Sequence, residues 1–288
     1  MLMNGVDLSA YCWLQAGVVF EFFAQKTNCL DTNGELLFEP KYVVAIDDDV
    51  VSAFYAAIIM KKARRKFGKS PRLLCCGGSG MLSKYLNRSD SGLIMTEGEK
   101  LSMVVRSLGD FPTKILDGGT NTGANIKEIA DYLNGDQEPI IFCLTQRVSK
   151  RIERTVAFST KQFPGTSHLN AYYFVPGETL EDMLQLYNGK GLANGLPLLS
   201  EAAALYDRFA NGKYEGKFMA PLGQAIPKYV AEAGLYLKSE FPIRVSRLPL
   251  SAPVQFVKMF WALKFSRKEI EDDLYLKINE WKKQLSAI

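Results

Sequence analysis

The sequence contains a single histidine, His168, so it has almost no imidazole to use as a general base or a metal ligand. Its five cysteines form no C-x-x-C pair and no metal-ligand spacing with that histidine, which argues against a structural zinc site or any other bound metal. Acyl-transfer hydrolysis needs a histidine or an evident activated nucleophile, and the motifs described below contain neither. His168 precedes an expected strand, where packing or a surface position explains it better than catalysis. These absences favour binding over catalysis.

Long apolar runs are also missing. A membrane-spanning helix needs about 20 mostly apolar residues, and the apolar stretch from Trp13 to Ala24 is interrupted by Gln15 and Glu21. The N-terminus lacks the basic region of a signal peptide. A net charge of +4 is too small to indicate nucleic-acid binding. We therefore expect a soluble, cytoplasmic protein with no membrane or nucleic-acid partner, of unknown oligomeric state.

Three of the five cysteines lie inside apolar strands. These are Cys75, Cys76 and Cys143, whereas Cys12 and Cys29 lie elsewhere. Cysteine in such runs behaves as a small buried hydrophobic residue, typical of a reducing compartment.

Apolar runs alternate with amphipathic stretches between residues 42 and 175. Short continuous apolar runs predict strands buried on both faces at residues 42–46, 72–76, 113–116, 139–144 and 170–175. Apolar residues at helical spacing predict helices at residues 50–67, 97–108, 123–133 and 147–163, the first of them ending at Gly68. The alternation predicts an α/β fold, a Rossmann-like doubly wound and mostly parallel sheet with right-handed crossovers.

Helical patterns flank this sheet on both sides in the sequence. Residues 1–35 are expected to form an N-terminal helical segment, with a helix at 8–26, that packs on the core. Residues 36–176 form the Rossmann-like domain, and residues 177–288 a mainly helical C-terminal portion, an added helical subdomain. Its last helix, from Arg267 to Lys283, carries apolar residues on one side: Ile270, Leu274, Ile278, Trp281 and Leu285.

Polar segments follow three of the expected strands, at the point where each strand leads to a helix. In open parallel sheets, ligands bind beyond the carboxyl ends of the strands, so the three segments indicate one shared pocket. A fourth segment, Asp47 to Asp49, follows the first strand. The expected ligand-binding residues are Asp47, Gly77, Gly78, Ser79, Gly80, Glu99, Asp117, Thr120, Asn121, Thr122, Asn125, Thr145, Arg147, Lys150 and Arg151.

Each segment also has a structural interpretation. The glycines of Gly77 to Gly80 allow backbone N–H groups to bind an anion, or form a plain turn at the end of a strand. They match neither a dinucleotide fingerprint nor a P-loop. Thr96 and Glu99 fit a capping box, and Glu99 is equally suited to accept a hydrogen bond from a ligand.

The segment from Thr120 to Asn125 is the most specific of the three. Thr122 can cap a helix, with Asn121 and Asn125 beside the free N–H groups of an anion site, although a structural loop is the alternative. Asp117 either binds a polar ligand group or organises the turn as an Asx motif.

Basic residues follow the fourth strand. Arg147, Lys150, Arg151 and Arg154 cluster on one helical face, opposite Val148, Ile152 and Val156. A solvated basic face is the default interpretation. Thr145 and Arg147 are nevertheless placed to meet a phosphate or carboxylate. The three aspartates at 47–49 either favour the N-terminus of the next helix or hold a hydrated cation.

The order of these motifs resembles the YdcF-like family, uncharacterised bacterial proteins that include SanA-type and ElyC-type envelope proteins. The resemblance rests on Gly77 to Gly80, Glu99, Thr120 to Asn125, and Leu144-Thr145 with its basic helix, and it covers residues 14–160 best. It implies a Rossmann-like sheet with a helical addition, as in the soluble YdcF branch. It also implies a nucleotide-like ligand, with S-adenosylmethionine as the candidate cofactor and no settled reaction.

The chain departs from this family at several polar positions. Leu116 and Ala124 stand where the family has acidic residues, and the histidine of many members after the fourth strand is missing. We therefore expect a protein that binds a nucleotide-like small molecule, and if it is an enzyme, a transferase or hydrolase that uses this ligand. The alternative is a non-catalytic regulatory or interaction protein with a degenerate pocket.

Overall fold

The computed structural model of the chain describes residues 26–46, 50–79, 95–120, 122–146, 148–149, 152–153, 155–157, 169–177 and 267–288. These residues belong to one compact unit, Gln25–Gly177 with Phe265–Ile288. The other unit, Met1–Ala24 with Glu178–Lys264, lies outside the described residues. The helix expected at 8–26 and most of the helical C-terminal portion therefore stay predictions, as do the domain boundaries.

A five-stranded, entirely parallel sheet forms the centre of the described unit. Its strands are β1 (Tyr42–Ile46), β2 (Arg72–Cys76), β3 (Thr113–Leu116), β4 (Ile140–Cys143) and β5 (Ala171–Phe174). All five strands were expected from the sequence, although β4 and β5 are slightly shorter than predicted. The strands lie in the order β3-β2-β1-β4-β5, which is the order of a Rossmann-like fold.

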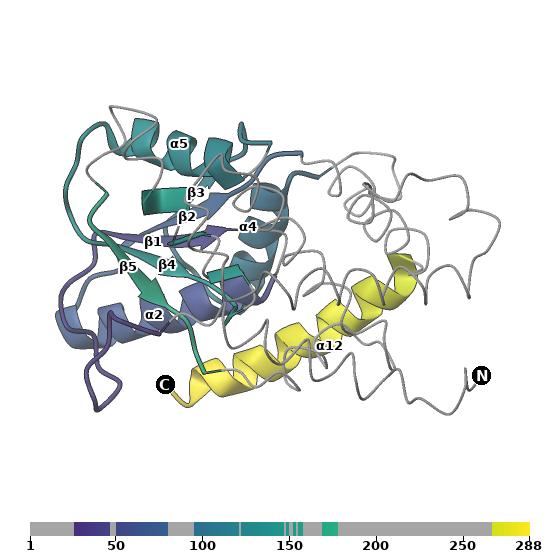
Figure 1. Cartoon of the computed structure of the whole chain (residues 1–288). Coiled ribbons are helices and arrows are strands. Elements are labelled where there is room, and N and C mark those ends of the chain that lie inside the picture. Colours follow the sequence, from purple (N-terminus) through teal and green to yellow (C-terminus); the bar gives the residue numbers. More distant parts are fainter. Residues whose placement is uncertain are drawn as a thin grey trace, which may run out of the picture. The chain divides into compact units, whose positions relative to one another are not determined.

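Helices cover both faces of the sheet, as expected for a doubly wound fold. Helices α2 (Val51–Phe67) and α4 (Glu97–Leu108) pack on β1, β2 and β3, and α5 (Thr122–Leu133) lies on the opposite face (Figure 1). The described residues after β4 join the side of α5, because Val148 and Ile152 share a core cluster with Ile126 of α5. The helices that follow β1 and β2 therefore lie on one face of the sheet, and the helical residues that follow β3 and β4 lie on the other.

The strands carry apolar side chains on both faces of the sheet, which explains why helices cover both faces. Val44, Leu74 and Phe142 are fully buried in the cluster beneath α5. Their neighbours Val43 and Ala45 are just as buried and, since side chains alternate along a strand, point to the face of α2. The continuous apolar runs in the sequence are thus the mark of strands with two buried faces.

The C-terminal helix α12 (Arg267–Ser286) packs against α2 and α4. Its residues Ile278, Trp281 and Leu285 are buried, which confirms this part of the expected apolar side. The indole of Trp281 stacks on the ring of Phe54 in α2, with ring centroids 5.0 Å apart and an interplanar angle of 7°. This contact joins residues more than two hundred positions apart in the sequence. None of the helices among the described residues has both the length and the apolar character needed to cross a membrane.

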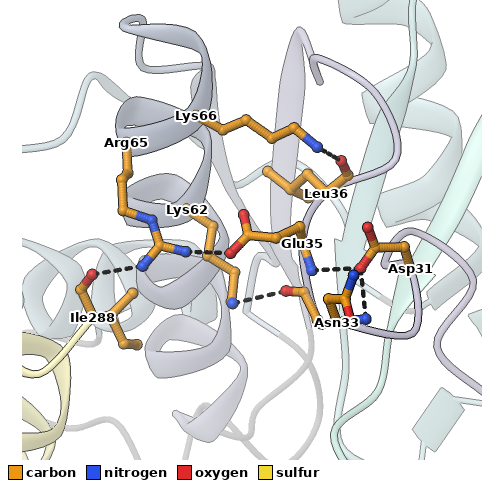
Figure 2. Close-up of polar contacts among 9 residues, drawn as sticks. Asp31, Asn33, Glu35, Leu36, Lys62, Arg65, Lys66 and Ile288 are labelled. Carbon is orange, nitrogen blue, oxygen red and sulfur yellow. Dashed lines mark hydrogen bonds and ion pairs between the residues drawn. The ribbon is translucent and has the colours of Figure 1, made fainter.

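Hydrogen bonds and an ion pair hold residues 34–36, which precede β1, against the C-terminal half of α2 (Figure 2). The Nζ atoms of Lys62 and Lys66 donate to the carbonyl oxygens of Gly34 and Leu36, at 2.8 and 2.5 Å. Arg65 binds the carboxylate of Glu35. Basic residues in the last turns of a helix also suit its negative end. The positive charges at this end of α2 are therefore used for structure.

Residues just before this segment cover the free edge of β5. Thr27 Oγ1 donates to the carbonyl oxygen of Val175 at 2.7 Å and accepts from the Val175 N–H at 2.9 Å. Asn28 does the same for Tyr173, with its N–H and its Oδ1 at 3.1 and 2.7 Å. Two side chains and one backbone N–H thus supply hydrogen bonds that a further strand would otherwise make.

The stack of Trp281 on Phe54 generates a stability prediction. Trp281→Ala should lower the free energy of unfolding of the full chain by about 3 kcal/mol, because it removes a large buried ring from a closed site. Tyr275→Ala, on the same helix but 72% exposed, serves as the control and should change it by less than about 0.5 kcal/mol. Urea denaturation followed by circular dichroism measures both; equal effects would show that α12 is not anchored through Trp281.

Candidate functional site

The loops after β2 and β3 are locked together by their backbones. Leu116 and Cys76 are paired in the sheet, so the two loops leave it side by side. The N–H of Gly77 donates to the Leu116 carbonyl at 2.9 Å, and the N–H of Gly78 donates to the Gly119 carbonyl at 2.7 Å. A Cβ atom at position 78 would lie only 2.3 Å from that Gly119 oxygen. Glycine is required at position 78 because two backbones meet there.

The start of α4 completes this arrangement. The N–H of Gly98 donates to the Gly77 carbonyl at 2.7 Å, and the N–H of Glu97 to the Gly78 carbonyl at 3.3 Å. A Cβ atom at Gly98 would lie 2.8 Å from the carbonyl oxygen of Cys75. These contacts support the interpretation of Gly77 and Gly78 as a structural turn, and a ligand-binding role for them stays a prediction.

Glu128 of α5 holds the loop after β3. Its two carboxylate oxygens accept from the N–H groups of Gly118 and Gly119, each at 3.0 Å. A carboxylate bound by successive backbone N–H groups occupies the position that an anionic ligand takes in a phosphate-binding loop. Within the described part of the chain, this turn is therefore organised by Glu128, whereas the side chain of Asp117 is exposed.

Asn125 lies behind the same loop. Its side chain is 4% exposed, and its Oδ1 has no hydrogen-bond partner among the described residues. This oxygen is directed at Gly119, where a Cβ atom would lie 1.9 Å from it. Helix α5 begins at Thr122, one residue earlier than expected, so Thr122 lies in the helix itself. Thr122 is buried and Thr120 is exposed.

Thr145 follows β4, which lies next to β1 at the point where the order of the strands in the sheet reverses. Ala45 of β1 pairs with Cys143, so the ends of these neighbouring strands are level. The carbonyl of Thr145 accepts from the N–H groups of Val148 and Ser149, at 3.2 and 3.1 Å, which places Thr145 at the start of a helical turn. Its side chain is 1% exposed, and Oγ1 has no partner among the described residues.

Glu99 forms the expected capping box at the start of α4. Its N–H donates to Thr96 Oγ1 at 3.1 Å, and its carboxylate accepts from the Thr96 N–H at 2.7 Å. The structural alternative for Glu99 is therefore confirmed, while its side chain remains exposed at the same edge of the sheet.

Other expected site residues lie outside the described residues: Asp47, Gly80, Asn121, Arg147, Lys150 and Arg151. Ser79 is half-buried directly after Gly78. The structure thus brings together Gly77, Gly78, Glu99 and Asp117, and it places Asn125 and Thr145 behind the carboxyl edge. Among the described residues, no three His, Cys, Asp or Glu side chains are grouped as metal ligands.

Sequence reasoning missed the role of Glu128. The sequence did offer a signal. Glu128 lies on α5, in the second turn of the helix that follows Gly118 and Gly119, so its side chain can reach back to the N–H groups of that loop. Sequence reasoning missed Gly98 too, because the need for glycine there comes from a close contact with the Cys75 carbonyl, which no local pattern reveals. Two further buried hydroxyls, Ser52 Oγ and Ser102 Oγ, also have no partner among the described residues.

The four cysteines that the structure describes are buried thiols, as expected for Cys75, Cys76 and Cys143, and Cys29 is buried as well. Burial raises the pKa of the Cys29 and Cys75 thiols to about 12, because the thiolate loses its hydration. The same desolvation raises the pKa of Cys76 and Cys143 well above its usual value. The cysteine beside the glycine loop is therefore no nucleophile in the folded chain.

Comparison of the chain with models of known protein families, with curated proteins and with solved structures found no match. The fold class is defined by the parallel sheet itself, a Rossmann-like α/β architecture with loops gathered at its carboxyl edge. The resemblance to the YdcF-like family stays a prediction.

The raised thiol pKa values predict slow alkylation of the folded protein. In a Cys12→Ser background, the other four cysteines should react with iodoacetamide at pH 8 only after unfolding in urea. Raising the pH from 7 to 9 should accelerate alkylation of the unfolded chain, whose thiols have a pKa near ~8.5, but not of the folded chain. Mass spectrometry of the modified peptides measures this, and rapid native labelling at Cys75 would contradict it.

Proposed function

We propose that this protein binds a nucleotide-like small molecule, with S-adenosylmethionine as one candidate, at the carboxyl edge of its parallel sheet. The observation that carries the proposal is the hydroxyl of Thr145, which is 1% exposed and has no partner among the described residues. A buried polar atom without a partner costs about 1–3 kcal/mol. A ligand that hydrogen-bonds to Thr145 would remove this cost.

The position of Thr145 in the sheet supports the same proposal. β1 leads to α2 on one face, and β4 leads to helical residues on the other face, so the chain leaves two adjacent strands in opposite directions. Ligands of open α/β sheets bind in the crevice at such a switch point. Thr145 is the first residue of the helical turn that starts there.

Asn125 provides a second buried acceptor near this edge. Its Oδ1 lies against the loop after β3 and lacks a donor among the described residues. Buried polar groups in native proteins nearly always have a hydrogen-bond partner, so an unpartnered one calls for an explanation, and a bound ligand would supply it. Two such groups at one end of the sheet support binding more strongly than either alone.

The resemblance to the soluble YdcF branch supports S-adenosylmethionine in particular, and we propose a distant relationship with that family. If the protein is an enzyme, its reaction would be a transfer or a hydrolysis that uses this ligand. A cytoplasmic location belongs to the same proposal, supported by the free thiols of Cys29, Cys75, Cys76 and Cys143.

The second candidate is a non-catalytic regulatory or interaction protein with a degenerate pocket. The observation in its favour is the packing of the glycine loops, since the N–H groups of Gly77, Gly78, Gly118 and Gly119 all have partners within the chain. A turnover assay with a metabolite library separates the two: a reaction abolished by Asn125→Ala would rule out the non-catalytic candidate.

Thr145→Val tests the hydroxyl that carries the proposal. Valine keeps the shape and removes the unpartnered oxygen, so the free energy of unfolding should stay the same or rise by about 1 kcal/mol. Affinity for S-adenosylmethionine or the best-binding nucleotide should fall roughly tenfold, a loss of ~1.4 kcal/mol. Calorimetric titration and thermal unfolding measure the two effects.

The matched control for Thr145→Val is Ser102→Ala, which removes another buried unpartnered hydroxyl inside α4. It should affect stability in the same direction and leave affinity unchanged. No saturable binding of S-adenosylmethionine or any common nucleotide to the wild-type chain would sink the proposed function.

Asn125→Ala is expected to weaken ligand binding by at least roughly tenfold, since it removes the buried acceptor behind the loop after β3. Asn170→Ala is the control, because Asn170 is exposed and precedes β5 at the opposite end of the sheet. Equal affinities of the two variants, with both folded by circular dichroism, would remove Asn125 from the site.

A further inference from the structure

The glycine N–H groups of the loops after β2 and β3 already have hydrogen-bond partners. Phosphate-binding loops present free N–H groups at the end of a strand or the start of a helix. Here Gly77 and Gly78 donate to backbone carbonyls, at 2.9 and 2.7 Å. Gly118 and Gly119 donate to the carboxylate of Glu128, each at 3.0 Å. A phosphate at the loops after β2 and β3 would find the N–H groups of these four glycines already hydrogen-bonded.

The Glu128 carboxylate also supplies the negative charge that such a loop attracts. An anionic ligand would have to displace this carboxylate from its two hydrogen bonds. If it bound beside the carboxylate instead, the two negative charges would repel each other. Carboxylates of neighbouring residues add to the effect, since Glu97 lies against Gly77 and both Glu99 and Asp117 are at the same edge. Among the described residues of these loops and the first turn of α4, Lys100 alone is basic.

Asn125 indicates independently which kind of ligand group would fit at this loop. Its Oδ1 can only accept a hydrogen bond, is 4% exposed, and is directed at Gly119 of this loop. A phosphate has only acceptor oxygens when fully ionised, so it cannot satisfy an acceptor. A hydroxyl, amine or amide N–H of a ligand can.

We infer that the ligand group seated against the loops after β2 and β3 is an uncharged or cationic hydrogen-bond donor, and that Glu128 excludes phosphate there. Sugar hydroxyls or an amine of an unphosphorylated nucleoside have this chemistry. The inference rests on the proposed function and narrows its ligand class. Glu128 would determine specificity because it occupies the N–H groups of Gly118 and Gly119 that a phosphate would need.

The first experiment compares adenosine, AMP and ATP by calorimetric titration of the full wild-type chain. Adenosine should bind at least roughly tenfold more tightly than AMP or ATP, a difference of ~1.4 kcal/mol. If AMP or ATP bound as tightly as adenosine, the inference would be wrong and the proposed function would stand. If none of these three bound and S-adenosylmethionine did not bind either, the proposed function would fail and the inference with it.

The second experiment tests the loop without relying on a nucleoside. Inorganic phosphate, titrated to millimolar concentration, should leave the amide resonances of Gly118 and Gly119 unchanged in the wild-type chain. Glu128→Ala frees both N–H groups, so phosphate should then shift these resonances in a saturable way. Glu128→Gln, which removes the charge and keeps the size, should give an intermediate response.

Glu138→Ala is the control for these variants, because Glu138 is an exposed glutamate close to the N-terminal end of β4. It should behave as the wild type does with phosphate. Saturable phosphate shifts at Gly118 and Gly119 in the wild type would overturn the inference. So would a Glu128→Ala chain that stays folded and shows no response to phosphate.

Discussion

The contact between the backbones of Gly78 and Gly119 constrains the whole carboxyl edge of the sheet. A hydrogen bond of 2.7 Å joins the loops after β2 and β3 at a distance that no side chain other than hydrogen allows. The start of α4 is added through Gly98, and Glu128 of α5 closes the arrangement from the other face. Two helices on opposite faces are thereby positioned by one pair of loops.

The same arrangement changes how glycine-rich loops are interpreted. Glycine after a buried strand is often taken to indicate an anion site, because its backbone can approach a phosphate closely. In this chain the close approach is made by a second loop and by a carboxylate of the protein itself. Polar groups left without a partner, Asn125 Oδ1 and Thr145 Oγ1, therefore say more about a ligand than the glycines do.

Much of the described fold could be predicted from the sequence, because the signals were local. The apolar runs of β1 to β5, the αL residue Gly68 after α2 and the capping box of Thr96 and Glu99 each depend on neighbouring residues. The strand order and the pairing of Glu128 with Gly118 depend on which distant segments meet, and no local pattern encodes that. Helix α5 begins at Thr122, one residue earlier than predicted, because sequence patterns locate helix ends only to within one or two residues.

The coverage of β5 by Thr27 and Asn28 has a consequence for how molecules of this protein meet one another. An exposed outer strand can act as a template on which another chain adds its own strand, the first step of aggregation. Here the backbone groups of Tyr173 and Val175 are already bound by the side chains of Thr27 and Asn28 and by the backbone N–H of Asn28. A second molecule would have to displace those hydrogen bonds before it could extend the sheet. Thr27 and Asn28 thus disfavour the addition of a strand from another molecule at this edge.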